Sequence, residues 1–479
     1  MTLYFDKYYS FLLLFVIIGL SLCNFLLIHK YNIFVGDDGV LATIFSGKYY
    51  DNKLFSIICP EIDFHKLYYI VVGYAYFLYF DLINNIINYF NLEFRWINSG
   101  SLILFFLSIF FFYKTFNSKK KFFLIIILLT LEPFLVLSHS IRHDILIFLG
   151  NAILLYCLSL NDSKRKNLLE IFSIVLLTVH PGGLPLLIAY FIYHLILSNN
   201  LKIIYLSLSC VFIILLSSHM KGILNLETVS YILSNPASSL ISINNIFFDL
   251  FDYFYNAKYK RHLIEILLPL LYLITIYDFN KFSKKLKILF FFPFIYLIGY
   301  IIILGYFNIS YLKFFYFFFL VYLSLYFLEI KNKFNQLLLY ASSSIYLIVF
   351  FGIFVVFINH NPWKYAEKNI SSILENIESN KLISAPLYFS YLAPKINNEY
   401  LPISQLDAPG TDKCFNKYQS QNNKLDYVFV DTRSLNDTFY GTKIKNYLND
   451  YTIVESIYIG RLGTLSLDKN GYLYFYKLN

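Results

Sequence analysis

Apolar runs of about 20 residues recur along the first three-quarters of the chain, and this repetition limits its fold more than any other feature. A helical run of that length spans the hydrocarbon core of a bilayer. Hydrophobic residues make up 58% of the sequence and charged residues only 14%, whereas a soluble domain carries about 25% charged residues. This balance excludes a soluble enzyme, a disordered chain and a nucleic-acid-binding module, and we expect a multi-pass membrane protein.

The apolar runs predict a polytopic, mainly α-helical transmembrane bundle of about 11–13 spans, since several runs are shorter than a standard span. They lie near 9–29, 67–90, 99–117, 122–138, 144–160, 168–180, 184–198, 203–218, 263–278, 288–304, 313–328 and 336–358. The net charge of +9 lies mostly in short basic clusters between these runs. Such clusters orient a membrane protein, so the positive charge does not imply an anionic partner.

Basic residues in short loops mark the cytoplasmic side of a membrane protein. The clearest clusters lie at 119–121, 164–166, 281–285 and 331–333. They predict that the outward segments are 139–143, 180–183, 219–262, 305–312 and 359–479. In a Gram-negative cell this outward side is the periplasm, and the protein would lie in the inner membrane.

The N-terminal part does not fit this orientation without an exception. If Lys7 is cytoplasmic, the first loop, 30–66, lies outside, and two full spans at 67–90 and 99–117 would leave the following basic cluster outside as well. We therefore expect that one of these two runs is not a simple crossing. The polar stretch Asp81–Asn85 is where the first run would break into a short span and a surface helix.

After Pro362 the composition becomes that of a soluble domain. The pattern predicts helices over 364–379 and 439–450, strands over 426–430 and 452–459, and a hairpin turn at Asp468–Gly471 before a last strand. The predicted organisation is thus a membrane domain, 1–360, followed by a small α/β domain outside the membrane, 361–479. A stabilising or lid-like role is favoured for this second domain, because it carries no nucleotide-binding glycine motif.

Two carboxylates, Asp37 and Asp38, lie between Gly36 and Gly39 in the first outward loop. Adjacent carboxylates beside a bilayer suggest a reactive site. A solvated turn is the structural alternative, because Asp and Gly favour turns.

A second polar group, Ser138–Asp144, falls between two apolar runs on the same predicted side. Ionisable residues at a membrane boundary are candidates for function. Arg142 and His143 could bind a phosphate, and Asp144 could orient either of them. The alternative is a cluster of interfacial side chains that reach toward the headgroups.

Two further histidines lie on the predicted outward side. His180 precedes Pro181, Gly182 and Gly183, which interrupt a long apolar stretch; such breaks line cavities or form hairpins between short spans. His65 precedes the second apolar run, where it could face a polar cavity or anchor the chain at the interface. The acidic pair, the Arg-His-Asp group and the His-Pro-Gly-Gly break therefore share one predicted face.

The order of these features resembles the GT-C superfamily of integral-membrane glycosyltransferases, in particular the bacterial relatives of protein O-mannosyltransferases and of the lipid A aminoarabinose transferase. The matching elements are Asp37-Asp38, His65-Lys66-Leu67-Tyr68-Tyr69, Arg95-Trp96-Ile97-Asn98, and the series Pro133, Ser138, Arg142 and Asp144. The likeness in layout covers most of the chain, but residues match only in about the first 185. The chain departs from the family pattern at Lys66, where a proline is usual.

This resemblance implies transfer of a sugar from a polyprenyl-phosphate donor to a lipid, glycan or protein acceptor on the outer face of the membrane. Asp37 would be the general base, and Asp38 would orient it or hold a divalent metal. Arg142, with His143 or Lys48, would neutralise the leaving phosphate. No other cofactor is implied.

Two other functions are compatible with many spans. An O-antigen-type polysaccharide polymerase usually carries its arginines in a large loop in the middle or second half of the chain, and 219–262 offers only Arg261. A lipid or glycan transporter or flippase would place charged residues at mid-bilayer depth in several spans. Here the ionisable residues gather at the ends of the apolar runs, which favours the transferase.

Overall fold

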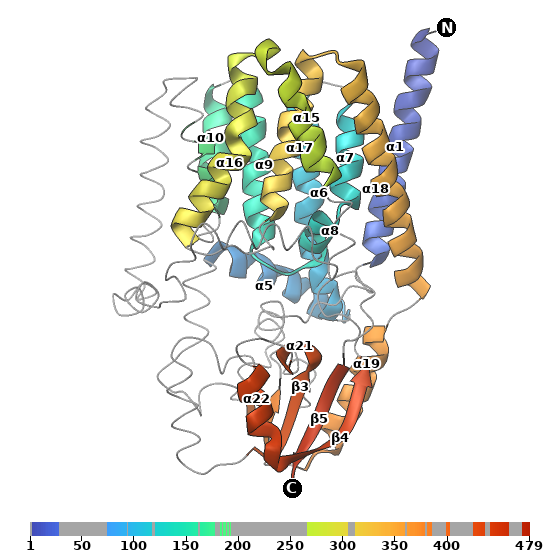
Figure 1. Ribbon diagram of the computed structural model, residues 1–479, viewed down its shortest axis with the longest axis vertical. Helices are drawn as coiled ribbons and strands as arrows, with labels where there is room; N and C mark the ends of the chain where they lie inside the picture. Colours follow the sequence, from blue (N-terminus) through green and yellow to red (C-terminus); the bar gives the residue numbers. More distant parts are fainter. Residues whose placement is uncertain are drawn as a thin grey trace.

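The computed structural model describes residues 2–27, 74–92, 94–116, 120–160, 163–177, 266–304, 312–359, 362–378, 381–385, 399–402, 425–435, 441–458 and 472–479, with a few positions between 183 and 192. Long helices run side by side, and a small sheet domain lies beyond one end of them (Figure 1). The helices and 3-10 turns up to the sheet domain are α1 (Thr2–Leu27), α5 (Tyr74–Tyr89), η1 (Phe94–Ile97), α6 (Asn98–Thr115), α7 (Lys121–Thr130), α8 (Glu132–His139), α9 (Asp144–Ser159), α10 (Ser163–Leu177), α15 (Leu267–Ile274), η5 (Thr275–Lys281), α16 (Lys284–Leu304), α17 (Leu312–Glu329), α18 (Lys333–Asn359) and α19 (Pro362–Asn376).

Two of the described helices, Asn98–Thr115 and Lys333–Gly352, are long and apolar enough to cross a membrane. A third crossing would be formed by Lys121–Thr130 and Pro133–His139 together, which meet at a bend of 67°. The bend has a local cause, because Pro133 lacks the N–H that would continue the helical hydrogen bonds and Leu131 is extended. The described part is therefore mostly helical with two or three candidate spans, and a bundle of 11–13 spans stays a prediction.

The two ends of the bundle differ in charge. α6, α9 and α17 begin at the end that faces the sheet domain, which we call the site end (Figure 1). The clusters that contain Lys120, Lys284 and Lys331 lie at the opposite end, which we call the basic end; there the ammonium of Lys120 bonds the carbonyl of Phe327 at 3.2 Å. The sheet domain and the basic clusters are thus separated by the length of the bundle, and the side of the membrane on which each lies stays a prediction.

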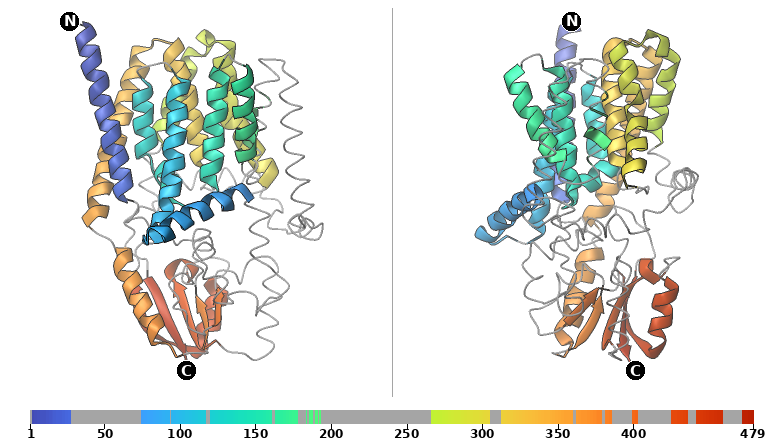
Figure 2. Two further views of the ribbon diagram at one scale, coloured as in Figure 1. Left: turned by 180° about the vertical axis from the view of Figure 1, so that it is seen from behind. Right: turned by 90° about the vertical axis from the view of Figure 1, so that its left-hand side faces the viewer.

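α5 lies across the site end, strongly inclined to the other helices (Figure 2). It runs without interruption through Asp81–Asn85, so the predicted break at this stretch is wrong. Helical spacing of Phe80, Ile83 and Ile87 on the buried side keeps the helix continuous there. The part of run 67–90 that the structure describes is one helix that does not run parallel to the bundle; 67–73 lie outside the described residues.

α5 ends in a Schellman motif that turns the chain into α6. The N–H of Leu92 bonds the carbonyl of Ile87 at 3.0 Å, and the N–H of Asn91 bonds that of Asn88 at 3.1 Å. Asn91 has a φ of 50°, a left-handed conformation that asparagine tolerates better than most residues. This turn fixes the change of direction between the two helices.

A polar network joins η5, α17 and α18 at the basic end, and its central residue, Asp278, lies outside the candidate spans. Asp278 accepts hydrogen bonds from Lys281 Nζ at 2.7 Å, Tyr326 Oη at 2.6 Å and Asn332 Nδ2 at 2.8 Å. Asn332 Oδ1 also accepts the backbone N–H of Phe334 at 3.0 Å and thereby caps α18. Burial raises the pKa of Asp278, but these hydrogen bonds outweigh it and hold the pKa at about 2.

Replacing Asp278 by Asn should therefore lower stability at neutral pH by about 1.5–3 kcal/mol, the range for hydrogen bonds to a charged group. The pKa lies below the unfolded value of 3.8, so this stabilisation is complete above about pH 4 and is lost as the pH falls toward 2. The apparent Tm in detergent checks this: the gap between the wild type and the variant should be constant from pH 8 to pH 5 and should narrow on further acidification. A gap that is absent at pH 7 would contradict the prediction.

The C-terminal domain contains a five-stranded sheet of order β2-β1-β3-β5-β4. The strands are β1 (Leu382–Ala385), β2 (Glu399–Pro402), β3 (Tyr427–Asp431), β4 (Tyr451–Tyr458) and β5 (Tyr472–Leu478), with α21 (Thr432–Leu435), α22 (Gly441–Tyr447) and η9 (Leu448–Asp450) between β3 and β4. β1 pairs in parallel with β2 and β3, whereas β5 is antiparallel to β3 and β4. The predicted strands near 426–430 and 452–459 and the helix over 439–450 are confirmed; β1 and β2 were not predicted.

The sheet is covered on both faces. Ile370 and Leu374 of α19 belong to the same buried cluster as Phe429 and Phe475. On the other face, Val428 and Val430 pack with Ile444 of α22. α19 follows α18 after a short connection, so the bundle leads directly into this domain (Figures 1 and 2).

Candidate functional site: an acid–base cluster at the site end

The candidate site is built on the turn Ser140–His143 between α8 and α9. Ser140 is extended and its N–H bonds the carbonyl of Val136 at 3.0 Å, which ends α8. Its hydroxyl then accepts the N–H of Arg142 at 3.2 Å. A serine side chain that bonds the backbone two residues on favours a turn over a continued helix. The new helix begins at Asp144.

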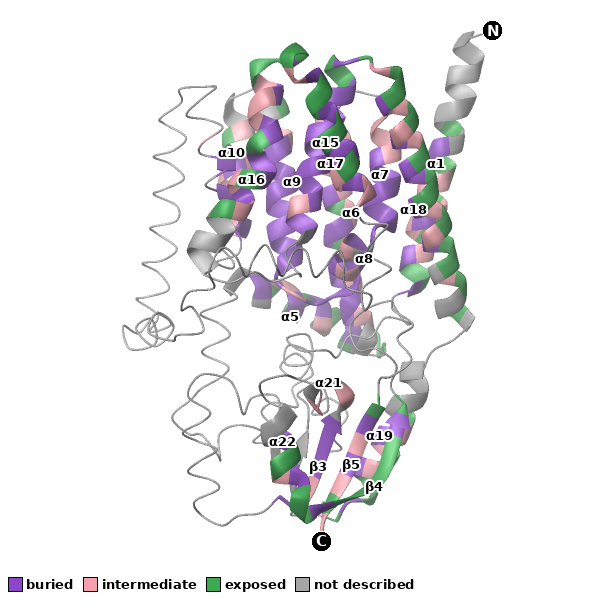
Figure 3. Ribbon diagram, viewed as in Figure 1, coloured by how far each residue is buried: buried purple, intermediate pink, exposed green. Residues whose placement is uncertain are grey.

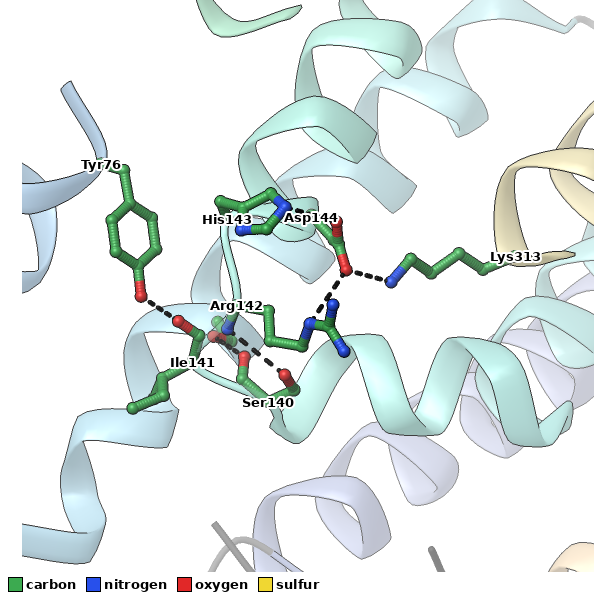
Figure 4. A network of polar contacts seen from close by, with 8 residues as sticks. Tyr76, Ser140, Ile141, Arg142, His143, Asp144 and Lys313 are labelled. Carbon is green, nitrogen blue, oxygen red and sulfur yellow. Dashed lines mark hydrogen bonds and ion pairs between the residues drawn. The ribbon is translucent and has the colours of Figure 1, made fainter. Parts of the chain in front are cut away.

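Asp144 is the centre of a buried ion cluster (Figure 4). Its Oδ2 lies 2.5 Å from Nζ of Lys313, the second residue of α17, and 3.3 Å from Nε of Arg142. Its Oδ1 lies 3.1 Å from Nε2 of His143. Asp144 and Lys313 are 169 residues apart in sequence, so this contact joins α9 and α17.

Because the cluster is buried, the stability of each charge depends on the opposite charge beside it. The Asp144 side chain has no exposed surface and that of Lys313 is 4% exposed. Buried charges persist only when they are paired, because the cost of leaving water must be offset by the partner. Asp144 also lies in the first turn of α9, where the helix dipole favours a negative charge. The carboxylate therefore has both an ionic and a dipolar reason to stay charged.

Arg142 is the member of the cluster nearest to solvent, with 22% of its side chain exposed. It faces Asp144 through Nε (Figure 4). Arg142, Lys313 and Asp144 together carry one positive charge in excess even with His143 neutral. A guanidinium held in place by a buried carboxylate can bind a phosphate or carboxylate through two nitrogens at once.

Two helices outside α8 and α9 fix the turn from the side. The hydroxyl of Tyr76 on α5 donates to the carbonyl of Ile141, and the hydroxyl of Ser101 on α6 donates to the carbonyl of Ser140. These bonds satisfy backbone carbonyls that would otherwise be buried in the turn without a hydrogen-bond donor. The backbone that carries Arg142 is thus held by α5 and α6 as well as by its own helices.

α1 reaches the same region through His139, the last residue of α8. The ring Nε2 of His139 lies 2.8 Å from the carbonyl of Asn24, and Asn24 Nδ2 donates to the carbonyl of Leu129 at 3.2 Å. His139 Nδ1 lies 2.8 Å from the hydroxyl of Ser138 and from the carbonyl of Leu135. The end of α1 and the start of α5 therefore both attach next to the Ser140–His143 turn.

The structure brings together three of the residues that the sequence singled out: Arg142, His143 and Asp144. Because Asp144 is completely buried, it can act on a bound molecule only through the groups it holds. The other predicted site residues lie outside the described residues; they are Asp37, Asp38, Lys48, His65 and His180. In the part of the chain that the structure describes, no group of three or more His, Cys, Asp or Glu side chains could hold a metal ion.

Lys313 was not predicted as a member of the site. A sequence signal for it exists, since a lysine directly inside an apolar run must find a counter-charge or reach the headgroups. The run 313–328 begins at this lysine and follows a predicted outward segment, the same side as Asp144. The pairing itself requires knowing that α17 packs beside α9, which local pattern does not reveal.

No protein-family model and no curated protein sequence matches this chain.

Proposed function

We propose that the chain is an integral-membrane glycosyltransferase of the GT-C type. It transfers a sugar from a polyprenyl-phosphate donor to a lipid, glycan or protein acceptor at the outer face of the membrane. The proposal includes a full bundle of about 11–13 spans, the number of apolar runs that could cross a bilayer. It also places the site end and the C-terminal domain in the periplasm of a Gram-negative cell.

The cluster around Asp144 is the observation that carries the proposal. A transferase that uses a lipid-linked sugar must bind a phosphate at the level of the headgroups and stabilise it as it leaves. Arg142 has the exposure and the fixed geometry for this, and Lys313 and His143 add positive potential behind it. The described basic residues of the predicted cytoplasmic clusters lie at the other end of the bundle, so this cationic group is not one of the orienting clusters.

The attachment of α1 and α5 supports a role for the first loop at the same place. The described residues that flank this loop are Leu27 and Tyr74. Near them, Asn24 bonds to Leu129 and His139, and Tyr76 bonds to Ile141. The described residues on both sides of this loop therefore bond beside the turn that carries Arg142, which is compatible with joint action of Asp37 and Arg142.

The proposed reaction assigns each of these groups one task. Asp37 takes the proton of the acceptor's hydroxyl or amine as that atom attacks C1 of the sugar. The bond between C1 and the phosphate oxygen breaks, and its electrons stay with the polyprenyl phosphate. Arg142 binds the charge that develops on this leaving phosphate. Asp38, Lys48, His65 and His180 remain candidates for orienting the base or binding the donor.

Alanine at Asp37 compared with alanine at Arg261 tests the proposal against the polymerase alternative. Purified protein in liposomes is given a radiolabelled polyprenyl-phosphate sugar and an extract of candidate acceptors. Asp37→Ala should reduce transfer by about 10²–10⁴-fold, the usual contribution of a general base, and Arg261→Ala should leave it within about twofold. The reverse order would favour the polymerase. Movement of the donor across the bilayer with no transfer to any acceptor would favour a flippase.

A further inference from the structure

α5 carries three distinct faces along its length, and one of them packs against other described parts of the protein. Tyr76, Phe80, Ile83 and Ile87 are buried and repeat at helical spacing. This face lies against α6, where a Cβ at Gly100 would come within 3.1 Å of Ile83. The contact explains why α5 stays on the bundle, but it involves only part of the apolar residues of the helix.

A second row of apolar side chains points away from the protein. Leu78, Leu82, Ile86 and Tyr89 follow one another at intervals of four, four and three residues, so they share one side of the helix. Leu82 is 56% exposed and Tyr89 is 81% exposed, and Leu78 and Ile86 are exposed as well. A continuous, exposed apolar row favours an apolar environment, because its contact with water costs free energy.

The third face is polar and lies on another side of the helix. Asp81, Asn85 and Asn88 are exposed and also repeat at helical spacing. A helix with a protein side, an apolar side and a polar side meets three different surroundings. Within a membrane protein, these surroundings coincide only at the boundary between the acyl chains and the headgroups.

The orientation of α5 agrees with such a position. It lies across the site end, whereas the neighbouring α6 runs along the bundle and is apolar enough to cross the membrane (Figures 1 and 2). α6 exposes Ile103, Leu107 and Phe110, again on one side of the helix, as a lipid-facing span does. The burial pattern in Figure 3 shows exposed residues along the outer sides of α1 and α18 as well.

We propose that α5 is an interfacial helix that binds the lipid bilayer through Leu78, Leu82, Ile86 and Tyr89. In this position the apolar row enters the acyl boundary of the leaflet at the site end, and Asp81, Asn85 and Asn88 face the headgroups and water. Tyr76 on the same helix bonds to the carbonyl of Ile141. Through this bond, the position of α5 in the membrane surface sets how deep the turn that carries Arg142 lies relative to the lipid headgroups. The inference does not require that the protein be a transferase.

A fluorescent probe at two positions of α5 tests this placement. The five cysteines are first replaced by alanine, and an environment-sensitive fluorophore is attached to Leu82→Cys or, as the matched control, to Asn88→Cys. Both variants are reconstituted in vesicles of phosphatidylethanolamine and phosphatidylglycerol. Lipids with a nitroxide near the headgroup should quench the probe at 82 at least about twofold more than the probe at 88, and aqueous iodide should show the opposite preference.

Three outcomes would overturn the inference. Equal iodide quenching at both positions would mean that the apolar row faces water. Protection of the probe at 82 from both quenchers would mean that protein covers the row, for example a second copy of the chain. Stronger lipid quenching at 88 would mean that the helix is rotated. Elution of each labelled variant as a single peak in size-exclusion chromatography, with an unchanged apparent Tm, ensures that the comparison is made on folded protein.

Discussion

Replacing Asp144 by Asn is expected to destabilise the folded protein by about 3–5 kcal/mol, because it removes the carboxylate that pairs a buried cation. Lys313 would keep its positive charge with 4% of its side chain exposed, and the guanidinium of Arg142 would remain nearby. Two like charges in a buried place repel each other and lack the hydration that they would have in the unfolded chain. The apparent Tm in detergent should fall sharply, and Glu455→Gln, an exposed carboxylate on β4, should leave it nearly unchanged.

The double variant makes the origin of this loss measurable. Lys313→Met keeps the length of the side chain and removes its charge, so Asp144→Asn combined with Lys313→Met should be more stable than Asp144→Asn alone. The coupling free energy should reach about 1–3 kcal/mol, as found for residues in one ion network. Strictly additive effects would mean that the two side chains do not interact in the folded protein, and the cluster would then not exist as described.

Replacing Arg142 by Ala is expected to leave the protein folded but to reduce sugar transfer by about 10²–10³-fold, the usual loss when one group that stabilises developing charge is removed. Folding should survive because Asp144 keeps Lys313 at 2.5 Å and His143 at 3.1 Å. Arg142→Lys should recover only part of the rate, since an ammonium cannot bind two phosphate oxygens through a planar fork. The transfer rate with a saturating lipid-linked donor is the quantity to measure.

The control for this experiment is a cation at the other end of the bundle. Lys114 is exposed in the last turn of α6, at the basic end, and Lys114→Ala should change the rate by less than about twofold, as expected for an exposed charge remote from the site. Equal losses in Arg142→Ala and Lys114→Ala would indicate a general effect of charge on donor binding. An unchanged rate in Arg142→Ala would remove the proposed phosphate site.

Several parts of the fold follow from local sequence pattern, and others depend on contacts that pattern does not contain. The strand at 426–430 and the helix over 439–450 are confirmed because each has the spacing of a buried element with clear ends. β1 and β2 are only four residues each, too short for alternation to stand out. The predicted break in α5 is wrong because polar residues at Asp81, Asn84 and Asn85 occupy one flank of a continuous helix, which a one-dimensional hydropathy profile cannot show.

The same distinction applies to the candidate site. Arg142, His143 and Asp144 are neighbours in sequence, so their clustering could be predicted from the turn between two apolar runs. Lys313 joins them across 169 residues through the packing of α17 near α9, and this contact decides that Asp144 is an organising residue. The roles of Asp37, Asp38, Lys48, His65 and His180 stay predictions, because these residues lie outside the part of the chain that the structure describes.

The central claim is that Asp37 and Arg142 share one site on the outer side of the membrane. The most direct test is to measure from which side each position can be labelled. Asp37→Cys and Arg142→Cys, each in a cysteine-free chain, are treated with a membrane-impermeant maleimide in right-side-out vesicles, and Lys284→Cys at the basic end serves as the marker of the opposite side. We predict that the probes at 37 and 142 react without permeabilisation and that added polyprenyl phosphate slows both reactions, whereas the probe at 284 reacts only after the vesicles are opened. Reaction at 37 and 142 from opposite sides of the membrane would contradict a shared outward site and the transfer reaction proposed for it.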